Sequence, residues 1–324
     1  MAAQRDIIAA AIAPLYWISC PLGVMPVKFD GRRFLTSRRL KIYSNLVCIL
    51  VAAVELYHLQ NIITSRIKKA MTGESILVVV SYLVGNTIII LNIFYVVVLR
   101  EKLISILNQL DQAAVALRRS IQVNFLLWRV RVFVICLQVL TTLIYFYLKV
   151  EEFHFDRGFS LKSLCHWAFV ACRICGKTTT MCTGAHFCVL CIIITALIEA
   201  TNRELRIWFE ATKVPGRKNQ ASLAERMIKL RIHHANIYFA AERVIGMYGL
   251  YVLLNLVYVN IFFQTSAFNI ISKAYKTIFL EHVTWNHTLS YNLYWIVVDV
   301  IKAGVYFYAA TFLAKEVRSQ HVQL

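Results

Sequence analysis

Six apolar stretches, each about long enough to cross a lipid bilayer, constrain this chain more than any other feature of its sequence. The hydrocarbon core of a bilayer is about 30 Å thick, and a helix needs roughly 20 residues to cross it. Lipid offers backbone N–H and C=O groups no partners, so a spanning segment is a helix or a strand of a closed barrel. Their length and lack of alternation favour helices. We place the spans at 42–61, 76–99, 132–148, 178–198, 245–268 and 291–314.

The composition agrees with an all-α fold, a polytopic transmembrane helical bundle. Of the 324 residues, 59% are hydrophobic and 16% are charged, whereas ordinary soluble domains have roughly 45–50% apolar and 25% charged residues. A net charge of +18 would suggest a nucleic-acid partner in a soluble protein. In a membrane protein the placement of the charges matters more, so we expect membrane lipid and no nucleic acid as a partner.

A seventh apolar run, Ile7 to Val27, is free of charge and also about long enough to span. Pro14, Pro21 and Pro26 lie in it, and each removes a helix hydrogen bond and clashes with the preceding turn. A continuous helix is therefore not expected. We predict a buried or interfacial N-terminal segment; a further span and a cleaved signal peptide are the alternatives.

The placement of Lys and Arg predicts the orientation in the membrane, because basic residues in short loops stay on the cytoplasmic side. The side of the N-terminus holds 24 of the 35 basic residues, and the opposite side holds 8. The N-terminus is therefore predicted to be cytoplasmic. The expected organisation is a cytoplasmic segment 1–41, a helical bundle 42–314 with cytoplasmic loops 100–131 and 199–244, and a cytoplasmic tail 315–324.

A glycosylation sequon gives a second indication of the orientation. The triplet Asn286-His287-Thr288 has the N-x-[ST] pattern and lies between the fifth and sixth spans, on the predicted external side. We therefore expect Asn286 to carry a glycan. This orientation is the opposite of that of G-protein-coupled receptors.

Charged side chains inside the spans are the best candidates for a functional site. They cost roughly 2.5 to 3.5 kcal/mol each on insertion scales and usually face a bundle interior or a wet cavity. Asp299 and Lys302 stand one helical turn apart and are expected to meet as an intramembrane ion pair, with a structural role or a role in ligand binding or gating. Glu55 and His58 share that spacing in the first span, where we favour a structural role.

Arg173 and Lys177 lie four residues apart in an apolar region that starts at Trp167. We expect them to face external water or a cavity and to attract polar or anionic groups of a ligand; snorkelling to lipid headgroups is the alternative. Aromatic walls with a few polar groups suit a small organic ligand or a sugar, although aromatics also anchor helices at the membrane interface. The candidate ligand-binding residues are Tyr82, Asn86, Tyr145, Arg173, Lys177, Phe263, Gln264, Tyr294, Trp295 and Asp299.

Cysteine spacing does not indicate a metal site here. Cys172-x-x-Cys175 and Cys188-x-x-Cys191 would lie on one membrane helix with their centres about 24 Å apart, whereas structural zinc sites place such pairs on turns of a soluble fold. No phosphate-binding loop, H-E-x-x-H or nucleophile-elbow motif is present in the sequence. We therefore expect no metal, no cofactor and no enzymatic activity.

Two predicted cytoplasmic segments have the apolar spacing of amphipathic helices. Leu103, Ile104, Leu107 and Leu110 fall on one face of a helix that would continue from the second span. A second apolar stripe follows a break at Pro215-Gly216. Two helices joined near that break would extend the fourth and fifth spans into the cytoplasm. The alternative is an amphipathic helix lying on anionic lipid. The second stripe consists of Leu223, Met227, Leu230 and His234.

Four groups of residues resemble insect gustatory receptors in their order and spacing. The resemblance covers nearly the whole chain. Each group is short, so the resemblance is specific only through the order and spacing of all four groups together. The groups are Leu15-Tyr16 to Tyr43 with Gly23, Pro26, Phe29-Asp30 and Ser37; Arg100-Glu101-Lys102-Leu103-Ile104-Ser105-Ile106-Leu107-Asn108-Gln109-Leu110; Asn202-Arg203-Glu204-Leu205; and His233/His234 leading to Tyr248-Gly249.

The resemblance implies a ligand-gated cation channel in the plasma membrane, a homo- or hetero-tetramer of seven-helix subunits with cytoplasmic N-termini. Each subunit would bind a small-molecule tastant in its outer half, and the region around Pro215 would hold the tetramer together. The family's seventh helix lines the pore and carries a Thr-Tyr, five-apolar, Gln-Phe signature, which is expected to be missing here because Lys315-Glu316-Val317-Arg318 resembles the preceding loop. A truncated isoform, an incomplete gene model and a degenerate receptor stay open, and conduction by this chain alone does not follow from the resemblance.

Two other functions stay open at this point. An odorant receptor of the same superfamily would share the fold and the topology. A membrane transporter would predict internal hydropathy repeats and paired broken helices, and we see no convincing repeat in the sequence.

Overall fold

A computed structural model describes most of the chain. The described residues are 7–25, 27–30, 33–67, 73–117, 120–134, 143, 161–212, 220–279 and 287–321. The elements in chain order are α1 (Ile7–Ser19), β1 (Val27–Phe29), β2 (Phe34–Thr36), α2 (Arg38–Ile67), α3 (Gly73–Ala116), α4 (Val123–Val134), α6 (Leu161–Thr212), α7 (Gln220–Phe279) and α8 (His287–His321).

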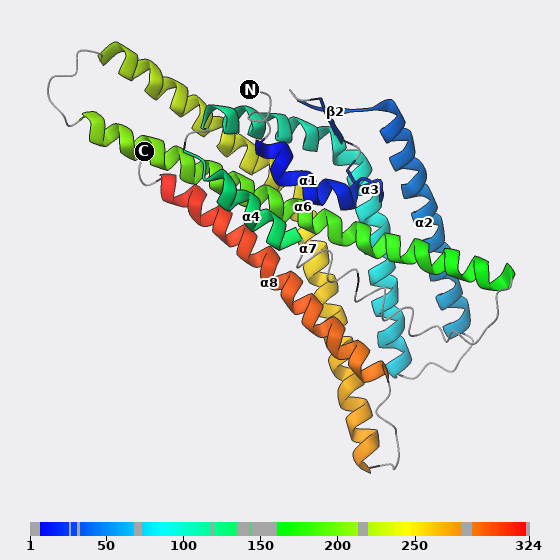
Figure 1. Cartoon of the computed structure of the whole chain (residues 1–324). Helices are drawn as coiled ribbons and strands as arrows, with labels where there is room; N and C mark the ends of the chain where they lie inside the picture. The colour runs from blue at the N-terminus through cyan, green and yellow to red at the C-terminus, as the bar shows by residue number, and fades with distance from the viewer. Residues whose placement is uncertain are drawn as a thin grey trace.

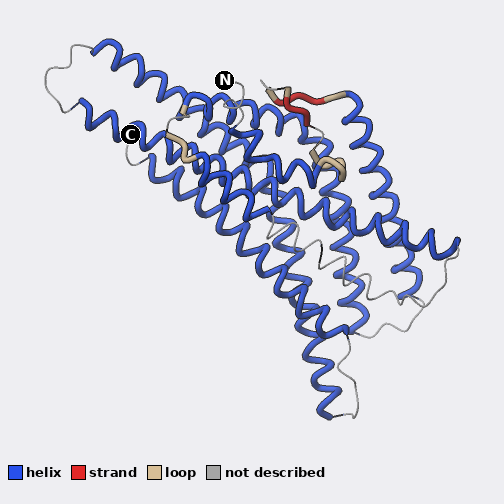
Figure 2. Tube along the Cα trace, viewed as in Figure 1, coloured by secondary structure: helices blue, strands red, loops and turns tan. Residues whose placement is uncertain are grey.

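The predicted all-α membrane fold is confirmed. Within the described residues, five helices are long and apolar enough to cross a membrane, namely α2, α3, α6, α7 and α8. They contain five of the six predicted spans. The remaining predicted span, 132–148, begins in α4 and lies mostly outside the described residues. Figure 2 shows how far helix dominates over strand and loop.

Helix α6 lies at the centre of the bundle, and the other long helices surround it (Figure 1). It packs against α2, α3, α7 and α8. In its most apolar window 89% of the residues are buried, against 17% in α2. The outward faces of the peripheral helices are apolar and exposed, as is expected of helices that lipid or other subunits surround.

The long helices run alternately between two ends of the bundle. At one end, which we call the termini end, lie the start of α2 and of α7 and the ends of α3, α6 and α8, together with α1 (Figure 1). At the other, which we call the far end, lie the end of α2, the starts of α3, α6 and α8, and the end of α7. The segments of α6 and α7 near Thr212 and Gln220 project side by side beyond the rest of the bundle (Figure 1). The prediction that these two helices extend past their spans is confirmed.

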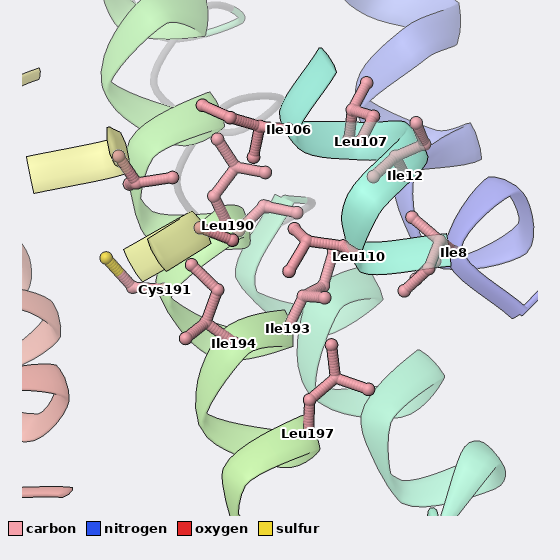
Figure 3. Packing of buried hydrophobic residues seen from close by; sticks show 14 of the residues in the cluster. Ile8, Ile12, Ile106, Leu107, Leu110, Leu190, Cys191, Ile193, Ile194 and Leu197 are labelled. Atoms are coloured by element: carbon pink, nitrogen blue, oxygen red, sulfur yellow. The ribbon is translucent and has the colours of Figure 1, made fainter. Parts of the chain in front are cut away.

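The largest apolar core lies at the termini end, where α1, α3 and α6 meet. Ile8 and Ile12 of α1 face Leu107 and Leu110 of α3, and Ile193 of α6 completes the contact (Figure 3). The predicted apolar stripe of α3 is confirmed, because Leu103, Ile104, Leu107 and Leu110 are all buried in the one continuous helix Gly73–Ala116. Asp111 of the same helix is buried as well.

The N-terminal segment is buried, as predicted, but its helix does not stop at its first proline. Helix α1 passes through Pro14 and ends at Ser19, so it has 13 residues, fewer than a span requires. Ile8 and Leu15 are almost fully buried. The contacts of α1 with α3, α4 and α6 compensate for the hydrogen bond that Pro14 cannot donate.

A short hairpin that the sequence analysis did not predict follows α1. Strands β1 and β2 are antiparallel, with Phe29 opposite Phe34. The Asn108 side chain on α3 accepts a hydrogen bond from the Phe34 N–H at 2.7 Å and donates one to the Phe34 carbonyl at 3.0 Å. This pair of bonds fixes the hairpin on α3.

Candidate ligand site

Four polar side chains that the sequence places on two helices gather in the far half of the bundle. We call Glu55 and His58 of α2 and Arg173 and Lys177 of α6 the Arg173 cluster. The Arg173 Nε atom lies 3.8 Å from Glu55 Oε1, and its guanidinium contacts the His58 ring nitrogen Nε2. Sequence spacing suggested that Glu55 and His58 form one pair; the structure gives them Arg173 as a common neighbour.

Glu55 is fully buried. Its side chain is 0% exposed, against 16% for Arg173. Among the described residues, neither Glu55 carboxylate oxygen nor the Arg173 Nε has a hydrogen-bond partner. A buried ion that lacks hydrogen bonds costs several kcal/mol, so the cluster holds polar groups whose bonding capacity is unused.

A glycine on α6 makes room for the Glu55 carboxylate. A Cβ atom at Gly176 would lie 3.0 Å from Glu55 Oε1 and 3.1 Å from a methyl of Val51. Because Arg173 and Lys177 are four residues apart, they share the face of α6 on which Gly176 lies. The sequence Arg173-x-x-Gly176-Lys177 therefore presents two cations with a gap between them that admits an acid from α2.

Tyr258 of α7 extends the cluster toward α3. Lys177 Nζ donates a hydrogen bond to the Tyr258 hydroxyl at 3.2 Å and lies 5.2 Å from its ring centroid. The ring packs so closely on α3 that a Cβ at Gly85 would be 3.0 Å from Tyr258 Cε2. The next residue, Asn86, is 2% exposed, and its Nδ2 has no partner among the described residues.

The other predicted ligand residues of α3 and α7 lie at different depths. Tyr82 is 43% exposed, and its ring centroid is 6.3 Å from that of His58. Phe263 is exposed, and Gln264 Nε2 donates to Asn260 Oδ1 on its own helix at 3.4 Å. The structure therefore brings Tyr82, Arg173 and Lys177 to one region and leaves Phe263 and Gln264 on the surface of α7.

The predicted residues of the last span are described only in part. Tyr294 is half-buried and packs against the Met181 and Val298 pair. Trp295, Asp299 and Lys302 lie on α8, but their side chains are outside the described residues, as are Tyr145 and Asn286. The Asp299–Lys302 ion pair and the glycan at Asn286 therefore stay predictions.

Sequence reasoning gave Glu55 and His58 a structural role only, and it missed Tyr258. The signal for the first two was present, since both are ionisable residues within a span. Tyr258 carried no comparable signal because aromatic residues are common in apolar helices. Among the described residues, no group of three or more His, Cys, Asp and Glu side chains could hold a metal ion.

The motifs that carry the resemblance make contacts at the termini end. The Tyr43 hydroxyl donates to the Pro21 carbonyl, and Arg100 donates to Asn45 Oδ1 at 3.0 Å. Glu101 pairs with Lys41. These bonds tie the N-terminal segment and α3 to α2, at the opposite end of α2 from Glu55 and His58.

The third motif holds the turn between α3 and α4. Arg203 donates to the Ser120 carbonyl at 3.2 Å, and the Ser120 hydroxyl bonds Glu204. In the fourth motif, Tyr248 is buried in the main core. The family resemblance thus rests on residues that assemble the termini end.

The comparisons with known proteins agree with this architecture. The family described as 7tm Chemosensory receptor matches residues 12–324. A search of the curated proteins found no match. The matched range includes every long helix of the bundle and both the Arg173 cluster and the motif contacts. This is a multi-pass membrane protein, and its family binds chemicals and is not a family of enzymes. The chain belongs to the 7tm chemosensory receptor family, of the insect gustatory receptor type.

Proposed function

We propose that this protein is a subunit of a taste receptor in the plasma membrane, and that its tastant binds at the Arg173 cluster with the N-terminus in the cytoplasm. The observation that carries the proposal is the buried Glu55 carboxylate, which has no hydrogen bond among the described residues. The bias of basic residues toward the termini end supports the orientation. In this orientation the cluster faces the outer half of the membrane, which external ligands reach first.

The unused bonding capacity indicates what a ligand would offer. Glu55 provides two acceptor oxygens, and Asn86 provides an amide donor. A hydroxyl group both donates and accepts, so a compound with several hydroxyls can satisfy both side chains. Tyr82, beside His58, and Tyr258, beside Lys177, provide aromatic surfaces. We infer that a small polyhydroxylated organic compound or a sugar is the ligand class.

We further propose that the chain acts in a tetrameric ligand-gated cation channel, alone or with other gustatory-type subunits. The paired ends of α6 and α7, which run to Thr212 and start at Gln220 beyond the predicted spans, support a subunit contact on the cytoplasmic side. Opening would require that ligand contacts differ between two arrangements of the helices. The charges buried between α2 and α6 are suited to couple ligand binding to a helix rearrangement, because a ligand hydroxyl would change their pairing.

The test is a calcium or voltage-dye recording from cells that express the 324-residue chain, alone and with a gustatory-type subunit that has seven helices. Sugars and polyols are applied with apolar odorants as the comparison. We expect responses to hydroxyl-rich compounds, and we expect Asn86→Leu to raise the half-maximal concentration about fivefold, as the loss of one hydrogen bond predicts. Asn124→Leu, at an exposed position of α4, is the matched control.

Ligand binding and conduction are measured separately. Ligand-induced thermal stabilisation of the purified chain reports binding whether or not current flows. Stabilisation by polyols that Asn86→Leu removes and Asn124→Leu preserves supports the site. The proposed ligand site would be overturned if Asn86→Leu and Asn124→Leu changed the stabilisation equally, or if apolar odorants alone stabilised the chain.

A further inference from the structure

An apolar groove lies between α4, α6 and α8, away from the Arg173 cluster. It has a volume of about 450 Å³ and is open along one side. Its walls are aromatic and aliphatic, and α8 contributes Gly304 to them. Residues that line it include Trp128, Phe133, Ile192, Thr195, Gly304 and Phe312.

The groove has the length of one lipid leaflet. On α8 it extends from Ile301 to Phe312, which is about 16 Å of helix. Half of a hydrocarbon core is about 15 Å thick. The groove residue of α6 nearest the termini end is Thr195. It lies three residues before the end of the predicted span 178–198. The groove therefore starts near the membrane boundary at the termini end and stops near the middle of the bilayer.

Polar groups lie at the mouth of the groove in an order that matches a phospholipid. Arg129 lines both the groove and the adjoining polar crevice, which also contains Glu199 and Arg203. The Arg129 guanidinium lies 5.0 Å from the Phe125 ring centroid, and in the part of the chain that the structure describes it makes no ion pair. A partly buried arginine at this depth is suited to bind a phosphate.

One helical turn before Glu199 on α6, a hydroxyl is available for the ester group of a lipid. Thr195 is 1% exposed, and its Oγ1 has no hydrogen-bond partner among the described residues. Below Thr195 the groove is lined by apolar side chains and by Cys188 and Cys191, whose thiols behave as small apolar groups. Charge, hydroxyl and apolar surface follow one another along the groove.

We propose that this groove binds one anionic phospholipid of the cytoplasmic leaflet. The phosphate lies at Arg129 with Arg203 nearby, the ester carbonyl accepts a hydrogen bond from Thr195, and an acyl chain fills the groove beside Gly304. Among the residues that line the crevice, Arg129 and Arg203 are basic and Glu199 is acidic, so this lining has a net positive charge. Glu204 accepts a hydrogen bond from Ser120 of the crevice but is not itself a lining residue.

A substitution whose side chain fills the groove tests the lipid site directly. Among the described residues, and apart from the backbone of the same helix, no atom lies within 4 Å of a Cβ placed at Gly304 or at Gly249. A phenylalanine can therefore be introduced at either position without a clash at its first side-chain atom. Gly304→Phe fills the groove, and Gly249→Phe on α7 is the matched control outside it. The full chain is purified in mild detergent, supplied with palmitoyl-oleoyl phosphatidylserine or phosphatidylcholine, and weighed by native mass spectrometry.

We expect the natural chain and Gly249→Phe to retain one phosphatidylserine in preference to phosphatidylcholine, and Gly304→Phe to retain neither. Arg129→Gln should reduce the preference for phosphatidylserine about fivefold, whereas Arg131→Gln, which does not line the groove, should leave it unchanged. Thr195→Val should weaken the binding of phosphatidylserine and of phosphatidylcholine about equally.

Three results would overturn the proposal. The first is equal lipid retention by the two phenylalanine variants when both give the thermal melting curve of the natural chain. The second is equal affinity of the natural chain for the two lipids. The third is a lipid-free dimer that Gly304→Phe dissociates, since the groove would then bind a second copy of the chain.

Discussion

Replacement of Glu55 and Arg173 in the Arg173 cluster tests how this buried pair contributes to stability. At 3.8 Å, the attraction between unit charges is about 4 kcal/mol at an effective dielectric constant of about 20. Removal of each ion from water costs several kcal/mol, so the intact pair is close to neutral in stability. The arrangement becomes unfavourable when one partner is lost, because the other charge stays buried.

The two single substitutions should therefore differ. Glu55 is 0% exposed and has no hydrogen bond among the described residues, so we expect Arg173→Met to cost about 3–5 kcal/mol of unfolding free energy. Glu55→Met should cost less, because Arg173 stays 16% exposed and keeps its contact with His58. The double variant should be close to the natural chain in stability, so the coupling energy should about equal the sum of the two single costs, at least about 3 kcal/mol.

The assay is SDS-induced unfolding of the purified chain in mixed micelles. The control cycle uses Glu225 and Lys229, whose side chains are 68% and 65% exposed and whose atoms approach to 2.6 Å. The hydrogen bond from Lys229 lowers the pKa of Glu225, but water screens both charges, so no measurable coupling is expected there. Additive effects of Glu55→Met and Arg173→Met, or a smaller loss for Arg173→Met than for Glu55→Met, would refute the reasoning.

Two further predictions concern glycines and the sequon. A Cβ at Gly184 would lie 2.0 Å from the Tyr306 hydroxyl, so Gly184→Ala should lower unfolding free energy by about 1–3 kcal/mol in the same assay. At Gly246 no described atom outside the backbone of its own helix lies within 4 Å of an added Cβ, so Gly246→Ala should be neutral or stabilising. Asn286→Gln should remove an endoglycosidase-sensitive mass from the chain expressed in cells, and an unchanged mass would contradict the proposed external position of Asn286.

The spans and the apolar helix faces could be predicted from the sequence because burial leaves a local pattern. The stripe of Leu103, Ile104, Leu107 and Leu110 repeats at helical spacing, and all four side chains are buried. The continuation of helix α1 through Pro14 could not be predicted in this way. Local rules place a break at that proline, whereas contacts with three helices distant in sequence maintain the helix.

The candidate site was less predictable than the fold because its contacts join distant segments. His58 and Arg173 are 115 residues apart, and no spacing rule relates them. The i,i+3 rule indicated only that Glu55 and His58 share a face of α2. The hairpin was missed for the same reason, since Asn108 contacts Phe34 over 74 residues. Local patterns thus identified which side chains were costly in a membrane and did not identify their partners.

The division between the two ends of the molecule leads to the last prediction. Arg100 lies in a resemblance motif at the termini end and donates to Asn45 at 3.0 Å, whereas Lys177 lies in the Arg173 cluster. If the motif residues only assemble the fold, Arg100→Gln should lower the unfolding free energy by about 1.5–3 kcal/mol. The amount of folded receptor should fall accordingly, and the half-maximal concentration of every ligand should stay the same.

Lys177→Met should act in the opposite way, because Lys177 can reach a ligand while the motif contacts are intact. We expect the yield of folded protein to stay near that of Lys229→Met, an exposed lysine at the other end of the molecule, and the half-maximal concentration to rise about tenfold, as the loss of one charged hydrogen bond predicts. Yield is measured by fluorescence-detected size exclusion and the response by calcium imaging. A ligand-selective shift from Arg100→Gln would mean that the termini end contributes to recognition, and the separation of assembly from binding would be wrong.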